Sequence, residues 1–262
     1  MYKALENLGS RALAGIEECG RTFNLLLLSL WHALLPPYRP YAIVRQIYFV
    51  GVRTFWLIVI SGLTIGMVLG LQFYNILERF GSVNMLGAGV ALGVIRELGP
   101  VMTALMVVGR AGSSITAELG IMRITSQVDA LECMAISADK FLVVPRLIGG
   151  ILSVPLLTAI FDVVALYGGY FVGVVMFDVP SGSYMNSMID AVNWSDVRLG
   201  LVKSVIFGGL ITLICCAKGF HMHLTKAGSR GAEGVSNVTT EAVVLSSIAV
   251  LFSDFLIGAL MQ

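Results

Sequence analysis

Long runs of apolar residues alternate with short polar segments along this chain of 262 residues. A helix needs about 20 apolar residues to cross the roughly 30 Å hydrocarbon core of a bilayer. Five runs reach about that length: residues 54–73, 85–109, 147–176, 199–217 and 242–261. We therefore predict an all-α membrane protein with five transmembrane helices. The third run is the longest and contains Pro155 and Gly168-Gly169, which leaves open whether it is tilted, kinked or partly re-entrant.

The segment that precedes the first run has a different pattern. Between residues 5 and 34 the apolar residues fall close to helical spacing, and the charged residues lie mostly on the other side. This pattern is typical of an amphipathic helix that lies in the membrane interface. Pro36-Pro37 and Pro40 would end the helix. We interpret residues 1–40 as this helix and an elbow, in preference to a gate.

Composition supports a membrane protein. Hydrophobic residues make up 57% of the chain and charged residues only 13%, whereas soluble domains average roughly 25% charged residues. The mean hydropathy is +0.88. No Pro-rich, Ser-rich or repetitive stretch separates a second domain, so we expect a single domain over residues 1–262, with the membrane-crossing part at 54–261.

Basic residues are distributed unequally between the two sides of the expected spans. Most of the 17 Lys and Arg lie in the N-terminal region, in the loop 110–146 and in the loop 218–240, whereas the opposite side carries only Arg79 and Arg198. Short loops rich in Lys and Arg stay in the cytoplasm. We therefore expect a cytoplasmic N-terminus and a C-terminus on the far side of the membrane.

Charged residues also lie inside the apolar runs. Arg96 and Glu97 occur in the second run, Lys203 in the fourth and Asp254 in the fifth. A charge in hydrocarbon is unfavourable by at least about 2.5 kcal/mol, so such residues usually face a partner or a wet cavity. These four charges sum to zero and could neutralise one another if the spans adjoin. Asp162 in the third run has no obvious partner.

Motifs for catalysis are missing from the sequence. It contains no H-E-x-x-H, no G-x-S-x-G and no G-x-x-x-x-G-K-[ST], so any ATP that drives transport must be hydrolysed by another polypeptide. Metal-type spacing is also missing, and His221-x-His223 is more typical of an interfacial helix end than of a ligand pair. We therefore expect no catalytic residue, metal or bound cofactor. The four cysteines, Cys19, Cys133, Cys215 and Cys216, are expected to be free thiols.

Two patterns in the first run suggest contacts. Gly62, Gly66 and Gly70 recur at four-residue spacing, which allows the backbones of two helices to approach closely in lipid. The partner could be internal or a second copy, and internal packing is the more general case. An apolar stripe then continues past the expected end of the span. It suggests either packing against the second span or the wall of a site for an apolar ligand, and its residues are Leu69, Phe73, Ile76, Leu77 and Phe80.

The segments around the second run carry a family resemblance. They read Leu92-Gly-Val-Ile-Arg-Glu-Leu-Gly-Pro100, Gly109-Arg-Ala-Gly-Ser-Ser-Ile-Thr-Ala-Glu-Leu-Gly-Ile-Met-Arg-Ile-Thr125 and Gln127-Val-Asp-Ala-Leu-Glu-Cys-Met134. They closely resemble the MlaE-type permeases, the membrane subunits of bacterial ABC transporters that act on phospholipids together with MCE proteins. The likeness extends from the amphipathic N-terminus to Asp254-Phe255, nearly the whole chain.

The resemblance implies an assembly and a role. The implied partners are a second copy of the chain, a cytoplasmic ABC ATPase pair that uses the ATP, a STAS-domain subunit, a hexameric MCE ring in the periplasm and phospholipid, with no nucleic acid. The implied role is phospholipid transport between the bacterial inner membrane and the MCE protein, in support of outer-membrane lipid asymmetry. In this family lipid sits between the two permease subunits, which favours a lipid-binding role for the stripe.

Such transporters couple ATP binding to transport through a cytoplasmic helix that docks in a groove of the ATPase. The segment 114–134 fits this role because it mixes polar side chains with apolar side chains that could anchor it. The alternative is a merely solvated helical loop. The residues expected to couple the permease to the ATPase are Glu118, Met122, Arg123, Asp129 and Leu131.

Readings from two other classes remain open at this stage. An ion-coupled secondary transporter would use the buried carboxylates Glu97, Asp162 and Asp254, and would usually show inverted internal repeats, which we do not find. A membrane scaffold without transport would not need a charged interior.

Overall fold

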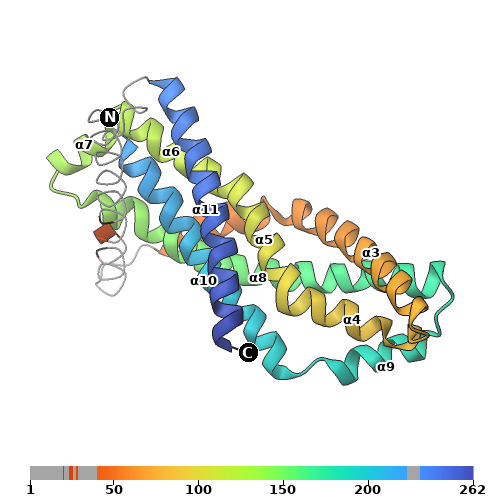
Figure 1. Ribbon diagram of the computed structural model, residues 1–262. Coiled ribbons are helices and arrows are strands. Elements are labelled where there is room, and N and C mark those ends of the chain that lie inside the picture. The colour runs from red at the N-terminus through yellow and green to blue at the C-terminus, as the bar shows by residue number, and fades with distance from the viewer. Residues whose placement is uncertain (1–19, 21–23, 26–27, 29–39, 223–230, 262) are drawn as a thin grey trace, which may run out of the picture.

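The computed structural model describes residues 20, 24, 25, 28, 40–222 and 231–261. Within these residues five helical stretches are long and apolar enough to cross a membrane, at Pro40–Arg79, Val83–Ile124, Asp139–Met176, Trp194–Phe220 and Ala232–Met261. The all-α class and the five predicted spans are thus confirmed. Figure 1 shows α3 (Phe55–Arg79) and α8 (Val144–Tyr170) side by side, and α8 is crossed by the pair α10 (Trp194–Phe220) and α11 (Ala232–Met261).

Several spans are divided by π-helical turns. In such a turn the backbone hydrogen bonds join residues i and i+5 instead of i and i+4, so the turn holds about one extra residue. The first span comprises α2 (Pro40–Ile47), the π turn Tyr48–Val52 and α3. The second comprises α4 (Leu86–Gly93), α5 (Gly99–Val107) and α6 (Ser113–Ile124), joined by π turns at Val94–Leu98 and Val108–Gly112. Turns of this kind occur frequently at functional sites because they redirect side chains and free backbone carbonyls.

The third span resolves the uncertainty left by its sequence. After a π turn at Asp139–Val143, α8 continues through Pro155 to Tyr170 and ends in a further π turn at Phe171–Met176. It is therefore one helical stretch long enough to cross a membrane, and not a re-entrant loop. Two shorter helices complete the described fold, α7 (Gln127–Cys133) after the second span and α9 (Ser181–Ala191) after the third.

The glycine ladder of α3 packs against α8. Gly62 faces the carbonyl of Phe161, Gly66 faces that of Ala165, and a methyl group at Gly70 would lie 3.1 Å from the Cα of Gly169. At Gly66 even a methyl group would overlap the opposing backbone. Small residues allow this approach, in which dispersion contacts replace the hydrophobic effect that lipid does not provide. The contact predicted from the ladder is therefore internal to the chain.

The helix α10 lies at the centre of the bundle, and α11 lies at its edge. In the most apolar window of α10, 67% of the residues are buried, against 11% in α11. Glycines again set the distance: a methyl group at Gly208 would meet the carbonyl of Gly150 on α8, and one at Gly219 that of Thr116 on α6. On its other side α10 approaches α11, where Cys215 Sγ lies 3.5 Å from Ser246 Oγ.

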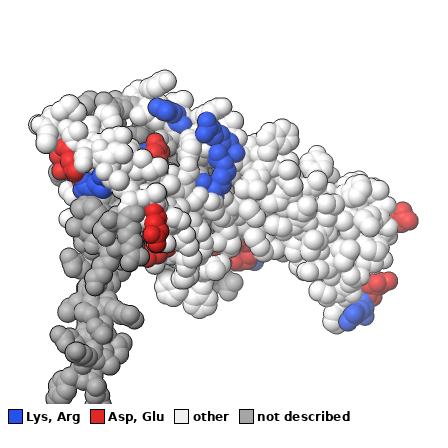
Figure 2. All heavy atoms as spheres, turned by 90° about the horizontal axis from the view of Figure 1, so that it is seen from above, with Lys and Arg blue, Asp and Glu red and all other residues white. Residues whose placement is uncertain are grey.

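A broad part of the surface drawn in Figure 2 carries few charged side chains. Figure 2 shows Lys, Arg, Asp and Glu gathered over the half of the molecule that holds α6 and α7, and again at the opposite tip. On the face drawn, the region between them is white, which is the distribution expected where helices face hydrocarbon.

Two sequence expectations fall partly outside this description. The interfacial helix expected at residues 5–34 lies almost entirely outside the described residues, and so do Cys19 and His223. The three described cysteines, Cys133, Cys215 and Cys216, are free thiols.

The ladder contact leads to a test by substitution. Gly66→Ala should destabilise the protein by about 1–3 kcal/mol, because the new methyl group must push α3 away from the backbone of α8. Gly258→Ala is the matched control, since nothing lies within 4 Å of a Cβ at that position of α11. The measurement is thermal unfolding of the detergent-purified variants. Equal unfolding temperatures for the two variants would contradict the packing described here.

Candidate functional site

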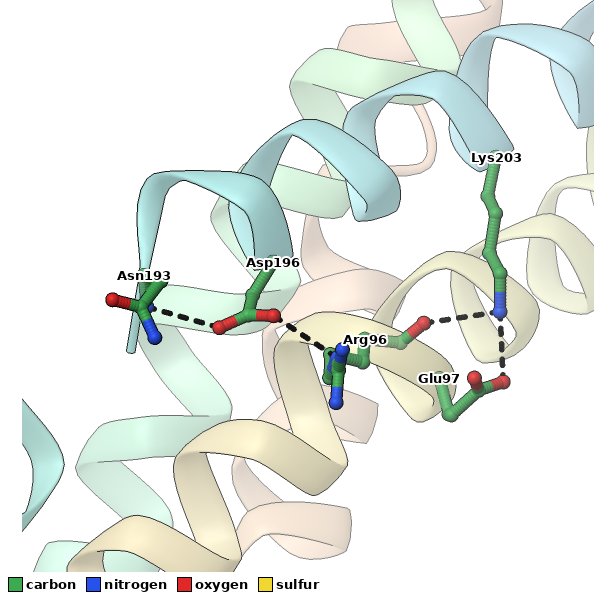
Figure 3. Close-up of polar contacts among 5 residues, drawn as sticks. All are labelled: Arg96, Glu97, Asn193, Asp196 and Lys203. Atoms are coloured by element: carbon green, nitrogen blue, oxygen red, sulfur yellow. Dashed lines mark hydrogen bonds and ion pairs between the residues drawn. The ribbon is translucent and has the colours of Figure 1, made fainter. Parts of the chain in front are cut away.

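The centre of the second span carries two adjacent charges whose side chains are partly exposed, 44% for Arg96 and 50% for Glu97. Arg96 and Glu97 lie in the π turn Val94–Leu98, which is followed by Gly99 and Pro100 at the start of α5. Proline lacks an N–H and its ring crowds the preceding turn, so a regular α-helix is unfavourable here. The widened turn gives the two adjacent side chains different partners on α10 (Figure 3).

Lys203 of α10 joins three spans. Its side chain has no exposed surface, and its Nζ lies 2.8 Å from Glu97 Oε2 on the second span and 2.8 Å from Asp254 Oδ1 on α11. The ammonium group also donates a hydrogen bond of 3.1 Å to the backbone carbonyl of Arg96. Two carboxylates and a carbonyl thus surround one buried cation, which compensates for the loss of its hydration.

Arg96 does not join this group through its side chain. Its Nε lies 3.0 Å from Asp196 Oδ1, while Asp196 Oδ2 accepts a hydrogen bond of 2.9 Å from the backbone N–H of Asn193. Asn193 and Asp196 form the capping box at the start of α10. The four residues expected to form one charge cluster are therefore divided: Glu97, Lys203 and Asp254 form one group, and Arg96 pairs with Asp196.

Sequence reasoning missed Asp196, although a signal for it was present. Asn193 stands three residues before Asp196 and just before an apolar run, which is the spacing of a capping box. The side-chain carboxylate of Asp196 therefore has two roles. It completes the start of α10 and neutralises a guanidinium on the second span.

Asp162 remains apart from both groups. Its carboxylate lies against Gly99, where it occupies the space that a side chain at that position would fill. Its Oδ1 is buried and has no hydrogen-bond partner among the described residues. The carboxylates named for ion coupling therefore do not form one site, since Glu97 and Asp254 share Lys203 and Asp162 does not.

The apolar stripe at the end of α3 contains both half-buried and exposed side chains. Leu69, Phe73 and Leu77 are half-buried and pack against the core. The ring of Phe73 lies over α4, where a methyl group at Gly89 would be 3.2 Å from its Cδ1. Ile76 and Phe80 point outward, with 51% and 77% of their surface exposed. Packing within the chain thus accounts for three residues of the stripe, Phe73 among them on α4, and two remain open for a ligand.

The segment 114–134 folds as two helices. α6 ends at Ile124, and α7 begins at Gln127 after a turn in which Ser126 has a φ of 53°. Glu118 pairs with the buried Arg146 at 3.0 Å, and Arg123 pairs with Asp129 at 2.7 Å and stacks on the ring of Phe220. Met122 and Leu131, which we expected to be anchors, are half-buried against the core of this chain.

Other apolar side chains are exposed at this end, and the sequence pattern did not single them out. They are Ile121, Ile124, Met134 and Ile136, and between 37% and 61% of the surface of each is exposed. They lie on or beside α6 and α7, next to the half-exposed carboxylates of Asp129 and Glu132. The combination of apolar and acidic groups is suited to a protein partner.

Comparison with known proteins decides the family. Residues 43–260 match the family model described as Permease MlaE. The chain belongs to the MlaE permease family. It is 42% identical over 220 residues to the intermembrane phospholipid transport system permease protein MlaE of Haemophilus influenzae, covering 84% of this chain and 82% of that protein. It is 40% identical to a probable ABC transporter permease protein of Rickettsia prowazekii, covering 99% and 98%.

Membership of the MlaE permease family confirms the resemblance seen in the sequence. Together with the five apolar helices, it makes the chain a multi-pass membrane permease. A probable ABC transporter permease protein of Synechocystis is also 35% identical over 83% of this chain and 81% of that protein. The matched region includes the second span and both groups of charges described above.

The charge geometry predicts a ranking of variants. Lys203→Met should destabilise by about 3–5 kcal/mol, because it leaves two carboxylates facing each other without a cation, whereas Glu97→Gln should be milder. Glu97→Lys should destabilise more than Glu97→Gln, because it places two ammonium groups together. The measurement is the free energy of unfolding in mixed micelles.

A double-mutant cycle provides the control. Glu97→Gln and Lys203→Met should couple by more than about 0.5 kcal/mol, whereas Lys203→Met and Glu241→Gln should be additive within about 0.5 kcal/mol. Glu241 is a suitable comparison because its ion pair is with Lys218 and not with Lys203. Additivity in both cycles would show that Glu97 and Lys203 do not interact.

Proposed function

We propose that this chain is the permease subunit of an ATP-driven ABC transporter that moves phospholipid between the bacterial inner membrane and a periplasmic MCE protein, and so supports outer-membrane lipid asymmetry. The observation that carries the proposal is the family match over residues 43–260, together with the relative from Haemophilus influenzae that is named as an intermembrane phospholipid transport permease. No bond-breaking role is assigned to any residue of the chain.

The proposed assembly follows from this role. Two copies of the permease form a homodimer, a cytoplasmic ABC ATPase pair hydrolyses the ATP, a STAS-domain subunit accompanies the ATPase, and a hexameric MCE protein lies in the periplasm. The chain itself binds no cofactor. The excess of Lys and Arg in the N-terminal region and in the loops 110–146 and 218–240 supports an N-terminus in the cytoplasm and a C-terminus in the periplasm.

The exposed part of the apolar stripe is the proposed lipid contact. Ile76 and Phe80 lie at the end of α3, which is periplasmic in this orientation, and their side chains point away from the core. A second copy placed against this end would enclose them in an apolar space suited to acyl chains. Leu69, Phe73 and Leu77 contribute from behind by packing against the core, and Phe73 lies on α4.

Photocrosslinking tests the lipid contact. A photoreactive amino acid at Ile76 or Phe80 should capture phospholipid that stays bound to the detergent-purified dimer, because acyl chains enclosed between subunits are not removed with bulk lipid. The control position is Leu156 on α8, which is 62% exposed but lies away from this end of α3. Mass spectrometry identifies the adduct. Lipid captured at Leu156 and not at Ile76 or Phe80 would overturn the assignment.

The ATPase contact is proposed to involve the outer surface of α6 and α7. Since Met122 and Leu131 pack inward, the anchors available to a partner are Ile121, Ile124, Met134 and Ile136. Asp129 and Glu132 supply polar contacts beside them, and the ion pairs of Arg123 hold the angle between the two helices. A movement of the ATPase would reach the second span directly, because α6 is its last segment.

A pull-down tests both the partner and the surface. The intact permease should recover an ATPase whose hydrolysis is sensitive to vanadate, and changing Met134 and Ile136 together to aspartate should release it. Charge in an apolar docking contact typically weakens binding by more than about 2 kcal/mol, or about thirtyfold. Membrane abundance should persist, because both side chains are exposed.

Two controls keep this result specific. Met85→Asp changes a residue that is 63% exposed and precedes α4, at the other end of the second span, and should leave ATPase recovery unchanged. Normal recovery with the double aspartate variant would move the contact to another loop. Failure of the intact protein to recover any vanadate-sensitive ATPase would contradict the ABC role itself.

A further inference from the structure

Two arginines meet where α3 begins on the first span and where the second span passes into α6. Arg53 follows the π turn Tyr48–Val52, and Arg110 lies within the π turn Val108–Gly112. The guanidinium carbons of both residues lie 5.7 Å from the centroid of the same ring, that of Phe49. Two spans that are distant in the sequence thus place two positive charges at one location.

Neither arginine has an acidic partner among the residues that the structure describes. Several other cations of the bundle do: Arg96 pairs with Asp196, Arg146 with Glu118, and Lys203 with Glu97 and Asp254. In the described part of the chain, Arg53 and Arg110 form no such pair within 4 Å. Their charges also act on each other, which is unfavourable in a medium of low dielectric constant.

The guanidinium group of Arg110 is held in a fixed orientation. Its Nη1 donates hydrogen bonds of 3.2 Å to the carbonyl of Phe49 and 2.9 Å to Thr54 Oγ1. Thr54 is fully buried and donates in turn to the carbonyl of Val50 at 2.6 Å, so it cannot rotate away. These bonds use Nη1 alone. The N–H groups on Nη2 and Nε remain available, and a planar array of such donors matches the oxygens of a phosphate group.

The surroundings place the pair at the membrane surface. Exposed Tyr48 and Trp56 lie on either side of Arg53 along the first span, with 56% and 71% of their surface accessible. Aromatic rings of this kind are enriched at the level of the lipid head groups. Arg53 itself is exposed, while Arg110 is half-buried. The pair is therefore open to a head group whose acyl chains lie along the apolar surface of α3.

We propose that Arg53 and Arg110 form a binding site for the phosphodiester of an anionic phospholipid in the leaflet next to the start of α3. The ligand neutralises two like charges that the chain leaves uncompensated. A head group that carries its own ammonium is less suitable, because that ammonium would face the same two cations. The site lies roughly 35 Å along α3 from the proposed lipid contact at Ile76 and Phe80.

Binding to the purified protein tests this site without any measurement of transport, so it can fail independently of the proposed function. The probe is dioctanoyl phosphatidylglycerol, and the readout is the rise in unfolding temperature during its titration. Arg53→Gln should raise the half-saturating lipid concentration about fivefold. Arg110→Lys keeps the charge but loses the planar donors, and should also weaken binding. Arg45→Gln, which removes an exposed arginine of α2, should bind like the parent protein.

Three further titrations identify the ligand. Dioctanoylglycerol, which lacks phosphate, should not compete, and dioctanoyl phosphatidylcholine should bind more weakly than phosphatidylglycerol. Inorganic phosphate at the same concentration should not stabilise the protein. An equal loss of binding in Arg45→Gln and Arg53→Gln would show diffuse electrostatic attraction and overturn the site. Saturation by inorganic phosphate alone, or equal affinity for phosphatidylcholine, would overturn the assignment to an anionic lipid.

Discussion

Lys203 has no exposed side-chain surface, and an ammonium group that has lost its water must be neutralised by the protein. The chain meets this requirement with Glu97 from the second span and Asp254 from the fifth, each 2.8 Å away. Because the ion pairs join three helices, they determine which faces of these helices meet and at what height. α11 depends on this contact in particular, since little of its surface is otherwise buried in the chain.

Close backbone contact between helices supports the same arrangement. The glycines of α3 and of α8 leave no space for side chains between these helices, and Gly150, Gly208 and Gly219 place α10 against α8 and α6. In lipid such contacts are effective because many small dispersion terms add up when surfaces fit closely. They hold the first, third and fourth spans together, while the π turns of the second span direct Glu97 and Arg96 toward separate partners on α10.

The arrangement of the charges suggests how a movement could pass through the permease. The second span begins beside the end of α3, carries the charge pairs at its centre and ends in α6, whose outer side chains are open to a partner. One helical stretch therefore connects α6 with α10, α11 and the exposed end of α3, and a displacement at α6 would have a direct route to them. The proposed function calls for such a connection, because it places an ATPase on one side of the permease and a lipid site on the other.

The sequence by itself determined the class of protein. Five apolar runs, the glycine ladder and the motifs around residues 92–134 were sufficient to predict the spans, a close helix contact and the family, because hydropathy and small-residue spacing are local properties of a segment. It also indicated that Arg96, Glu97, Lys203 and Asp254 could neutralise one another. The sequence could not show which charge pairs with which. Arg96 and Glu97 are adjacent in the same apolar run, and the sequence does not say which helix each side chain faces.

Only the tertiary structure separated these roles. The π turn directs Arg96 toward Asp196 and Glu97 toward Lys203. Packing likewise separates the half-buried residues of the apolar stripe, such as Phe73 on α4, from the exposed ones. The same is true of Met122 and Leu131, which are suited by composition to be anchors but face inward after the turn at Ser126. Which side of a helix is buried depends on the neighbours that the fold brings to it, and helical spacing alone does not contain that information.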